Sequence, residues 1–305
     1  MRSAVARDLA SLHRDRGVPR RTLIVLFAIA VAVAGMGMRA QAPGAPPFFF
    51  VQMSDPQFGM FTKDAGFEQE TTNLEMAIAT VNRWRPAFVV MTGDLVNKPG
   101  NARQIAEYHR ITRRLDRGIP LYSIAGNHDV ENEPTPVSVA AYVRRLGRDY
   151  YSFRSGPLAG IVLNSSLIHS PGKAPALYDA QLTWLREELA RPRTSGATHL
   201  VVFQHHPWFL SEATEADQYF NIPLERRGLY LSMFREAGVK YLFAGHYHRN
   251  AIAKSGDIEM ITTGPIGMPL GEGTQSGMRV VIVRDRGLTH RYYALGELPN
   301  QIDLK

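Results

Sequence analysis

Short apolar runs alternate with helical repeats in the part of the chain that follows residue 47. Continuous apolar character over four to six residues is typical of strands buried on both faces, and the first three such runs are residues 48–53, 87–91 and 121–124. Between them, apolar side chains recur at helical spacing in residues 67–84 and 102–115. Pro86 ends the first helix, and Gly118 and Pro120 close the second. This order predicts a parallel sheet whose functional residues gather beyond the carboxyl ends of its strands.

The second half of the chain predicts more strands, with turns between them. A pair of antiparallel strands is expected at residues 150–153 and 159–164, joined at Gly156 and Pro157. Further strands are expected at residues 199–203 and 240–244. Helices are expected at residues 137–146, 180–190 and 227–237. Residues 250–295 alternate strand-like runs with glycine turns, which favours a closing antiparallel sheet. The pattern predicts a single domain over residues 48–298, followed by a tail over residues 299–305.

The first 42 residues have the pattern of an export signal. Basic residues are followed by an apolar run at residues 23–34, which is too short for a comfortable membrane span, and by the small-residue site at Ala40 and Ala42. We expect cleavage after Ala42, a linker over residues 43–47, and a periplasmic or secreted protein with no stable membrane span. An uncleaved N-terminal anchor is the alternative. The pair Arg20-Arg21 partly matches a twin-arginine signal.

The composition of the mature chain excludes some classes of partner and site. Removing the seven basic and two acidic residues of the leader leaves 28 basic and 26 acidic residues, a net charge of about +2. A nearly neutral protein gives no reason to expect nucleic acid as a partner. The chain has no cysteine, so disulfides, thiolate metal sites and a cysteine nucleophile are excluded. Any metal must be held by His, Asp, Glu, Asn or Gln.

Five of the strand-like runs end in side chains that can bind metal ions. These are Asp55 with Gln57, Asp94, Asn127 with His128, His205 with His206, and His246 with His248. Each motif alone is ordinary turn chemistry. Their occurrence at five strand ends favours a metal site, because a carboxylate that bridges, flanked by oxygen and imidazole ligands, suits two divalent ions about 3.5–4 Å apart.

The motifs Asp-x-(His/Gln), Gly-Asp, Gly-Asn-His-Asp, His-x-Pro and Gly-His-x-His, in this order, resemble the calcineurin-like metallophosphoesterase superfamily. The resemblance covers residues 48 to about 295. Residues 55–59, 206–210, 219–223 and 245–250 are similar to the branch typified by the calcineurin-like phosphoesterase domain-containing serine/threonine phosphatase. The resemblance implies an α/β (α+β) fold, a four-layer αββα sandwich with its site at the strand ends.

The resemblance also implies a ligand set for two divalent metal ions. Asp94 bridges them, and His205 is preferred over His206 because it stands in the His-x-Pro position. The first ion takes Asp55, Gln57, Asp94 and His248, and the second takes Asp94, Asn127, His205 and His246. Most of the superfamily has histidine where this chain has Gln57. An amide oxygen favours Mn²⁺ or Mg²⁺ at the first site, with Zn or Fe left open. The purple acid branch has tyrosine at the position of Asn97, so a charge-transfer Fe(III) centre is not expected.

In the mechanistic hypothesis, His128 is the general acid. A hydroxide held between the ions attacks phosphorus, His128 protonates the leaving alkoxide, and Asp129 orients the ring of His128. A structural turn histidine is the alternative for His128. The candidates to line the substrate pocket are Arg249, Asn250, Asn164, Tyr219, Asn221 and His206.

The resulting prediction is a metal-dependent phosphomonoesterase that acts on a small phosphorylated substrate or a phosphoprotein. A phosphodiesterase for cyclic nucleotides or phospholipid head groups is the second hypothesis, because the same metal core serves both reactions in the superfamily. A metal-binding protein without turnover is the third. Loss of a ligand would favour this third hypothesis, but Gln57 is the one departure from the motif set, and His128 and Asp129 are both present.

Overall fold

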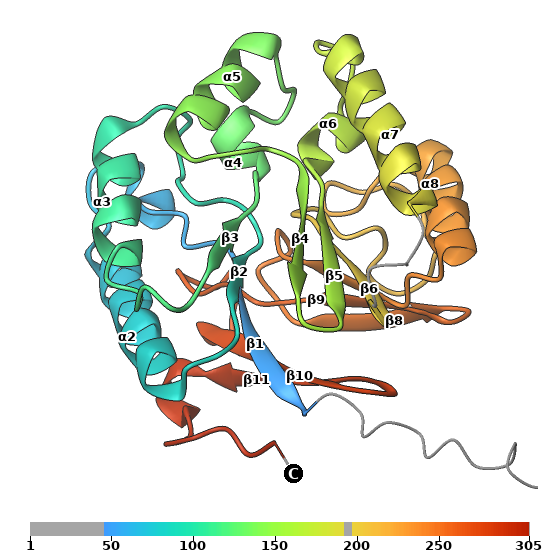
Figure 1. Cartoon of the computed structure of the whole chain (residues 1–305). Coiled ribbons are helices and arrows are strands. Elements are labelled where there is room, and N and C mark those ends of the chain that lie inside the picture. Colours follow the sequence, from blue (N-terminus) through green and yellow to red (C-terminus); the bar gives the residue numbers. More distant parts are fainter. Residues whose placement is uncertain (1–45, 192–196, 305) are drawn as a thin grey trace, which may run out of the picture. The chain divides into compact units, whose positions relative to one another are not determined.

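The structure is a computed structural model that describes residues 46–191 and 197–304. Within these residues the strands form a five-stranded sheet and a six-stranded sheet (Figure 1). The predicted export signal and residues 43–45 of the predicted linker lie outside the described residues, so both stay predictions.

The first sheet contains the predicted parallel strands. β1 (Phe48–Met53), β2 (Val89–Met91) and β3 (Leu121–Ser123) run parallel, with α2 (Glu68–Trp84) and α3 (Ala102–Thr112) as the crossovers. On the other side of β1 the sheet continues with β10 (Gly277–Arg284) and β11 (Gly287–Ala294), both antiparallel to their neighbours. The short helix α4 (Asn127–Val130) and α5 (Pro136–Arg145) follow β3 (Figure 1).

The second sheet has the order β4-β5-β6-β7-β9-β8. Its strands are β4 (Tyr151–Ser155), β5 (Leu158–Val162), β6 (His199–Phe203), β7 (Tyr241–Ala244), β8 (Ala251–Ser255) and β9 (Ile258–Thr262). The four central strands are parallel, and β4 and β8 are antiparallel edges. The helices of this half are α6 (Ser165–His169), α7 (Pro175–Ala190) and α8 (Leu224–Ala237). Two 3-10 helices, η1 (Met60–Thr62) and η3 (Leu295–Glu297), complete the described elements.

The expected closing antiparallel sheet over residues 250–295 is wrong in one respect. The segment forms two hairpins that join different sheets: β8 and β9 complete the second sheet, and β10 and β11 extend the first. Both faces of β10 are buried, since Val280 packs on the helix side and Val281 packs between the sheets. The strand therefore needs a central position beside β1, which local periodicity cannot indicate.

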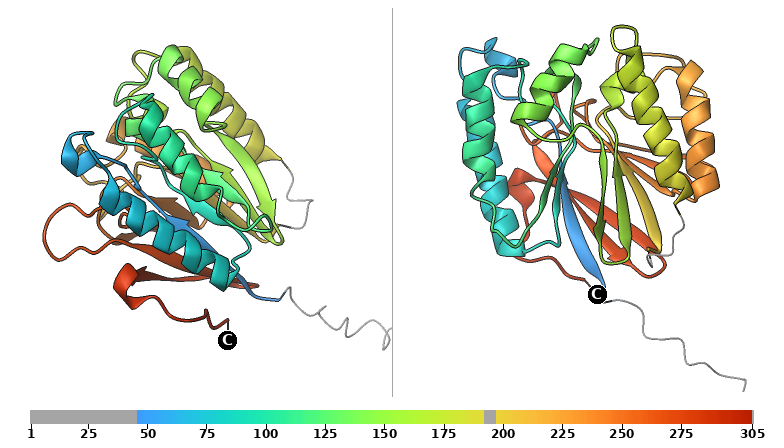
Figure 2. Two further views of the ribbon diagram at one scale, coloured as in Figure 1. Left: turned by 90° about the vertical axis from the view of Figure 1, so that its left-hand side faces the viewer. Right: turned by 45° about the horizontal axis from the view of Figure 1, so that its top comes forward.

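Three hydrophobic clusters in the described residues define four layers. One cluster joins the first sheet to α2, α3 and α5, another joins the second sheet to α7 and α8, and the third lies between the two sheets. Side chains of β1 alternate accordingly: Phe49 and Val51 face the helices, and Phe50 faces the other sheet. Figure 2 shows the two helical layers on opposite sides of the strands. The αββα sandwich is confirmed.

A buried glutamine joins the carboxyl ends of the two sheets. Gln52 on β1 is fully buried, and its Nε2 donates to Ala244 O of β7 at 3.0 Å and to Thr92 Oγ1 at 3.1 Å. Its Oε1 accepts from Thr263 Oγ1 at 2.7 Å. A buried amide without such partners would cost about 1–3 kcal/mol. Gln52 thereby links the segment before Asp55 to the segment before His246.

The expected tail packs onto the domain in the part that is described. Trp84 Nε1 of α2 donates to Pro299 O at 2.9 Å, and Ile302 and Leu304 pack against the first cluster. Among residues 46–191 and 197–304, no helix is long and apolar enough to cross a membrane.

Candidate metal centre

The turns that follow β1, β2 and β7 have a backbone conformation that is rare for residues other than glycine. Five of the predicted metal ligands have positive φ angles: Asp55 (51°), Gln57 (37°), Asp94 (49°), His246 (66°) and His248 (53°). Such residues cost of order 1–3 kcal/mol each and persist where the surroundings hold them. The sharp turns allow the side chains at successive strand ends to point toward one another.

Glycines before the ligands allow the turns to approach closely. A Cβ atom at Gly126, just before Asn127, would overlap Asp94. A Cβ atom at Gly245, just before His246, would overlap Ser54 and Asp55. The glycines of the Gly-Asn and Gly-His motifs are therefore required for space.

Two groups of buried side chains are close enough to hold metal ions. The His246 group consists of Asp94, His205 and His246, and the His248 group consists of Asp55, Asp94 and His248. Within each group, one ligand atom from every residue lies within 4.8 Å of the others. His205 Nε2 is 3.2 Å from Asp94 Oδ2, and His248 Nε2 is 3.5 Å from Asp55 Oδ1. Asp94 belongs to both groups.

Each of the three imidazoles is oriented by a backbone carbonyl. His205 Nδ1 lies 2.8 Å from Thr92 O, His246 Nε2 lies 3.2 Å from Tyr219 O, and His248 Nδ1 lies 3.0 Å from Met268 O. A carbonyl oxygen can only accept, so these nitrogens carry the protons. When the ring is neutral, its opposite nitrogen therefore has the free electron pair and can bind a metal ion, the arrangement typical of metal-binding histidines.

The facing atoms are nearly all acceptors, which fits a site for cations. His205 Nε2 lies 3.1 Å from His246 Nδ1 and 3.0 Å from Asn127 Oδ1. Asn127 turns its oxygen toward them because its Nδ2 donates to Asn132 Oδ1 at 2.8 Å. Gln57 Oε1 is buried without a hydrogen-bond partner in the described part of the chain. These oxygen and nitrogen donors fit divalent metal ions.

The electrostatics of the cluster also favour a bound cation. Burial alone would raise the pKa of Asp94, but the neighbouring His205 and His128 outweigh it and hold the pKa below its usual range. Burial would lower the pKa of His205, but the Asp94 carboxylate raises it to about 9. Burial and the proximity of His205 lower the pKa of His246 to about 3. A proton on His205 or a metal ion satisfies this buried negative charge.

His128 lies beside the cluster, but its ring is not held as expected. Its backbone N donates to Asp94 Oδ1 at 2.9 Å, and its ring Nδ1 lies 2.7 Å from Asn97 O. The expectation that Asp129 orients the ring is wrong, because the Asp129 carboxylate accepts three backbone N–H groups, from Gly126 at 2.8 Å, Leu95 at 3.1 Å and Val96 at 3.1 Å. Asp129 therefore joins the turns after β2 and β3. Burial, together with the charge of Asp94, raises the pKa of Asp129 to about 8.

The carbonyl that orients His128 belongs to a braced loop. Asp64 Oδ1 accepts from Asn97 Nδ2 at 2.8 Å and from Gln104 Nε2 at 2.7 Å. Gln104 Oε1 accepts from Asn97 N at 3.1 Å. Sequence reasoning missed Asp64 and Gln104, and it had no signal for them because the contact to His128 uses the main chain.

Three of the residues proposed to line the substrate pocket lie near the cluster. Tyr219 is 53% exposed, its ring centroid is 4.9 Å from that of His246, and its hydroxyl accepts from Asn127 Nδ2 at 3.2 Å. His206 is buried with its ring 4.3 Å from that of His246, and its Nδ1 contacts Ser165 Oγ at 3.0 Å. Ser165 Oγ also accepts from the backbone N of His205 and His206, a supporting role that sequence reasoning missed. Arg249 is exposed, and its Nε donates to Leu270 O at 3.4 Å.

The other three have structural contacts instead. Asn164 is fully buried and caps α6, with Oδ1 accepting from Leu167 N at 3.4 Å. Asn221 is fully buried and donates to Glu215 Oε1 at 2.7 Å. Asn250 Oδ1 accepts from Arg279 Nη2 at 2.6 Å. Asparagine serves caps and turns as readily as it binds ligands, and the structure shows such contacts for all three, so their place in the substrate pocket stays a prediction.

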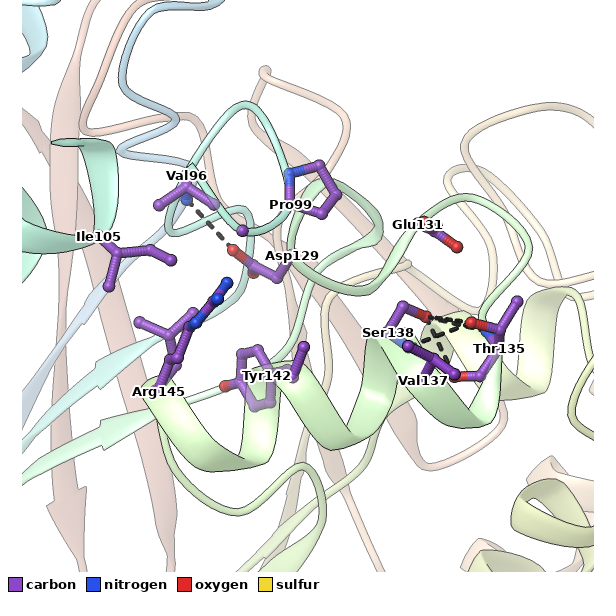
Figure 3. A pocket seen from close by; sticks show the side chains of 13 residues that line it. Val96, Pro99, Ile105, Asp129, Glu131, Thr135, Val137, Ser138, Tyr142 and Arg145 are labelled. Atoms are coloured by element: carbon purple, nitrogen blue, oxygen red, sulfur yellow. Dashed lines mark hydrogen bonds between the residues drawn. The ribbon is translucent and has the colours of Figure 1, made fainter. Parts of the chain in front are cut away.

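A cavity of about 200 Å³ lies between the loop after β2 and α5 (Figure 3). Figure 3 shows Asp129 on one wall, bonded to Val96, and Tyr142 and Arg145 of α5 nearby. Of the predicted site residues, Asp129 lines this cavity, whereas the proposed metal ligands do not. The cavity is therefore distinct from the metal-ligand cluster.

Comparison with known proteins decides the family. A family model described as calcineurin-like phosphoesterase matches residues 50–250, more than half of the chain. The chain belongs to the calcineurin-like phosphoesterase family. Membership makes it a hydrolase of phosphoric esters, which confirms the predicted enzyme class, and it implies divalent metal ions as cofactors.

Relatives within the calcineurin-like phosphoesterase family support the same assignment over most of the chain. The serine/threonine-protein phosphatase CPPED1 of Homo sapiens is 40% identical over 268 residues, covering 83% of this chain and 85% of that protein. The CPPED1 of Danio rerio is 35% identical over 279 residues, covering 87% and 90%.

Solved structures share the fold at low identity. A dimetal phosphatase from Danio rerio has a TM-score of 0.55 at 16% identity, with 82% of this chain and 100% of that chain covered. The purple acid phosphatase PPD1 from yellow lupin has a TM-score of 0.59 at 14% identity, with 84% and 53% covered. Both agree with the αββα architecture.

Proposed function

We propose that this protein is a dinuclear metal-dependent phosphomonoesterase. The observation that carries the proposal is the pair of buried ligand groups that share Asp94. One carboxylate common to two groups is what a pair of closely spaced divalent ions requires. The acceptor atoms that face one another in the cluster support the same interpretation.

The amide side chains would complete the two sites. Gln57 joins the His248 group, where its buried Oε1 has no hydrogen-bond partner among the described residues. Asn127 joins the His246 group through Oδ1. The His248 group then offers three oxygens and one nitrogen, which favours Mn²⁺ or Mg²⁺, and the His246 group offers two oxygens and two nitrogens, which favours Zn²⁺ or Fe²⁺ more strongly.

The chemistry of the bound ions would be to activate water and to neutralise charge on the phosphoryl oxygens. His128 holds the proton for the leaving group. Because its Nδ1 donates to Asn97 O, the proton that it transfers is the one on Nε2. Tyr219 donates its hydroxyl proton to a phosphoryl oxygen, since the Asn127 amide already donates to that hydroxyl oxygen. Arg249 is exposed at the edge of the site and attracts the substrate anion.

The proposed substrates are phosphoserine and phosphothreonine in proteins or peptides. The relatives with 35% and 40% identity are named serine/threonine-protein phosphatases, and their similarity extends over more than four fifths of this chain. The exposure of Tyr219 beside the cluster is compatible with a macromolecular substrate.

The test is to purify the full chain, measure its bound metals, and compare hydrolysis of an aryl phosphomonoester, a phosphothreonine peptide and an aryl phosphodiester. We expect about two ions per chain and faster hydrolysis of both monoesters. A strong preference for the diester would contradict the monoesterase assignment. No hydrolysis with Mn²⁺, Mg²⁺, Zn²⁺ or Fe²⁺ would contradict the enzyme.

A further inference from the structure

The segment between β6 and α8 is an irregular loop that contains its own polar core. Residues 210–223 contain no helix or strand, yet their backbone is closely bonded to two charged side chains. Fixing fourteen irregular residues costs conformational entropy, of order 1–2 kcal/mol per residue. Long loops that are ordered in this way often serve a functional site.

Glu215 is the first of these side chains. Its Oε1 accepts from Leu210 N at 2.8 Å and from Asn221 Nδ2 at 2.7 Å. Its Oε2 accepts from Ser211 N at 2.8 Å, Ser211 Oγ at 2.6 Å and Glu212 N at 3.3 Å. The Glu215 carboxylate therefore links the start of the loop, residues 210–212, to Asn221 near its end.

Arg227 is the second. It lies in the first turn of α8, and its side chain is fully buried. The guanidinium donates to Ile222 O at 2.8 and 3.0 Å, to Ala213 O at 3.0 Å and to Glu215 O at 2.8 Å. A buried charge is costly unless it is fully bonded. Its hydrogen-bond partners are three carbonyls of the loop, and Asp217 Oδ1 of the same loop lies 3.9 Å from its Nη2, so Arg227 holds the main chain of the loop in place.

Tyr219 of this loop lies at one side of the metal-ligand cluster. Tyr219 O accepts from His246 Nε2 at 3.2 Å, and Tyr219 Oη accepts from Asn127 Nδ2 at 3.2 Å. Both partners are proposed ligands of the same ion. His248, the imidazole of the other group, is oriented by Met268 O, which lies in a different segment. The loop therefore supports the His246 group and leaves the His248 group without this support.

We propose that Glu215 and Arg227 are positioning residues that set the metal affinity of the His246 group by holding Tyr219 against His246 and Asn127. The proposal rests on the proposed function, because it takes those side chains to be metal ligands. Partners that orient a metal ligand typically contribute 10- to 100-fold to metal affinity. Glu215 and Arg227 should therefore affect the affinity for the ion of the His246 group and not the affinity for the other ion.

The test is a Mn²⁺ titration of the chelator-treated full chain, with free Mn²⁺ followed by electron paramagnetic resonance. Glu215→Gln keeps the shape of the side chain but places an amide N–H₂ against backbone donors. We expect the dissociation constant of one ion to rise at least about tenfold and that of the other to stay within about twofold. The matched control is Glu212→Gln, an exposed side chain on the same loop, which should leave both constants unchanged.

A second variant covers the case in which Glu215→Gln does not fold. Asn221→Ala removes the link between Gln218 N and Glu215 while keeping the carboxylate. The same selective rise is expected, and excess Mn²⁺ should restore hydrolysis in both variants. Unchanged constants in the folded variants, or equal weakening of both ions, would overturn the positioning role. A wild-type chain that binds fewer than two ions would instead contradict the proposed function.

Discussion

The two halves of the cluster differ in both their ligands and their support. The His246 group has two imidazoles, and its proposed amide ligand Asn127 is oriented from two sides. The His248 group has one imidazole and two carboxylates, and its proposed amide ligand is Gln57, whose Oε1 is buried without a partner among the described residues. The carbonyl that orients His246 belongs to Tyr219 in the loop over residues 210–223, whereas the carbonyl that orients His248 belongs to Met268 in a different segment.

The two proposed sites are therefore unlike, although both lie at the same edge of one fold and share Asp94. In the proposed assignment, the His246 group has two nitrogen ligands and favours borderline ions, while the His248 group has three oxygen ligands and favours hard ions. Asp94 belongs to both groups, so the two proposed sites would share one carboxylate and differ in the metal ion that they prefer.

The largest effect should follow from removing what the halves share. Asp94→Ala takes a buried carboxylate from both groups, so we expect both ions to be lost and turnover to fall more than about 10⁴-fold. Metal analysis and kcat/KM measure this directly. Retention of one ion at normal affinity would show that Asp94 does not bridge.

Replacing His128 should lower the rate of hydrolysis without changing the metal content of either group. His128→Ala should lower kcat by about 10²- to 10⁴-fold with an alkyl phosphate while both ions stay bound. An aryl phosphate with a good leaving group should lose less, because it needs less protonation. Equal losses for both substrates would argue against proton donation from His128.

Gln57→His should make the two halves more alike. An imidazole in place of the amide adds a nitrogen ligand to the His248 group, so its affinity for Zn²⁺ relative to Mg²⁺ should rise on the order of tenfold, about 1.4 kcal/mol. Competition titrations of the two ions measure the change. A matching shift at the His246 group, or no shift at all, would remove Gln57 from the site.

The smallest effect should come from a residue that lies outside both halves. Asn164→Ala removes the cap of α6, so the free energy of unfolding should fall by about 1 kcal/mol, with KM for a phosphomonoester unchanged. Denaturant titration and steady-state kinetics separate these outcomes. A clear rise in KM with unchanged stability would place Asn164 in the substrate pocket.

Much of this structure could be predicted from the sequence because strand ends carry a local signal. Apolar runs followed by Gly-Asp, Gly-Asn-His-Asp and Gly-His-x-His place Asp94, Asn127 and His246 at one edge, and the structure brings them together. The alternation of strands and helices predicted the parallel core of the first sheet, and the family resemblance implied the four layers. The partition of residues 250–295 between two sheets did not, since β10 is apolar on both faces and could pair with either sheet.

The rest of the site depends on contacts that leave little trace in the sequence. Thr92, Asn97, Tyr219 and Met268 orient the histidines through their main-chain carbonyls, which every residue type possesses. Asp129 could have been recognised from its place three residues after Gly126, where a carboxylate reaches back to the start of a helix. Asn164 has the same ambiguity, because an asparagine before a helix is as much a cap as a ligand.

The most direct test of the divided centre is the metal content of His246→Ala and His248→Ala beside the wild type. We expect two ions in the wild type and one in each variant at the same free metal concentration. The ion that His246→Ala retains should be Mn²⁺ or Mg²⁺, and the ion that His248→Ala retains should prefer Zn²⁺ or Fe²⁺. Equal loss of both ions from either variant would contradict the division, and a wild-type chain without bound metal would contradict the centre itself.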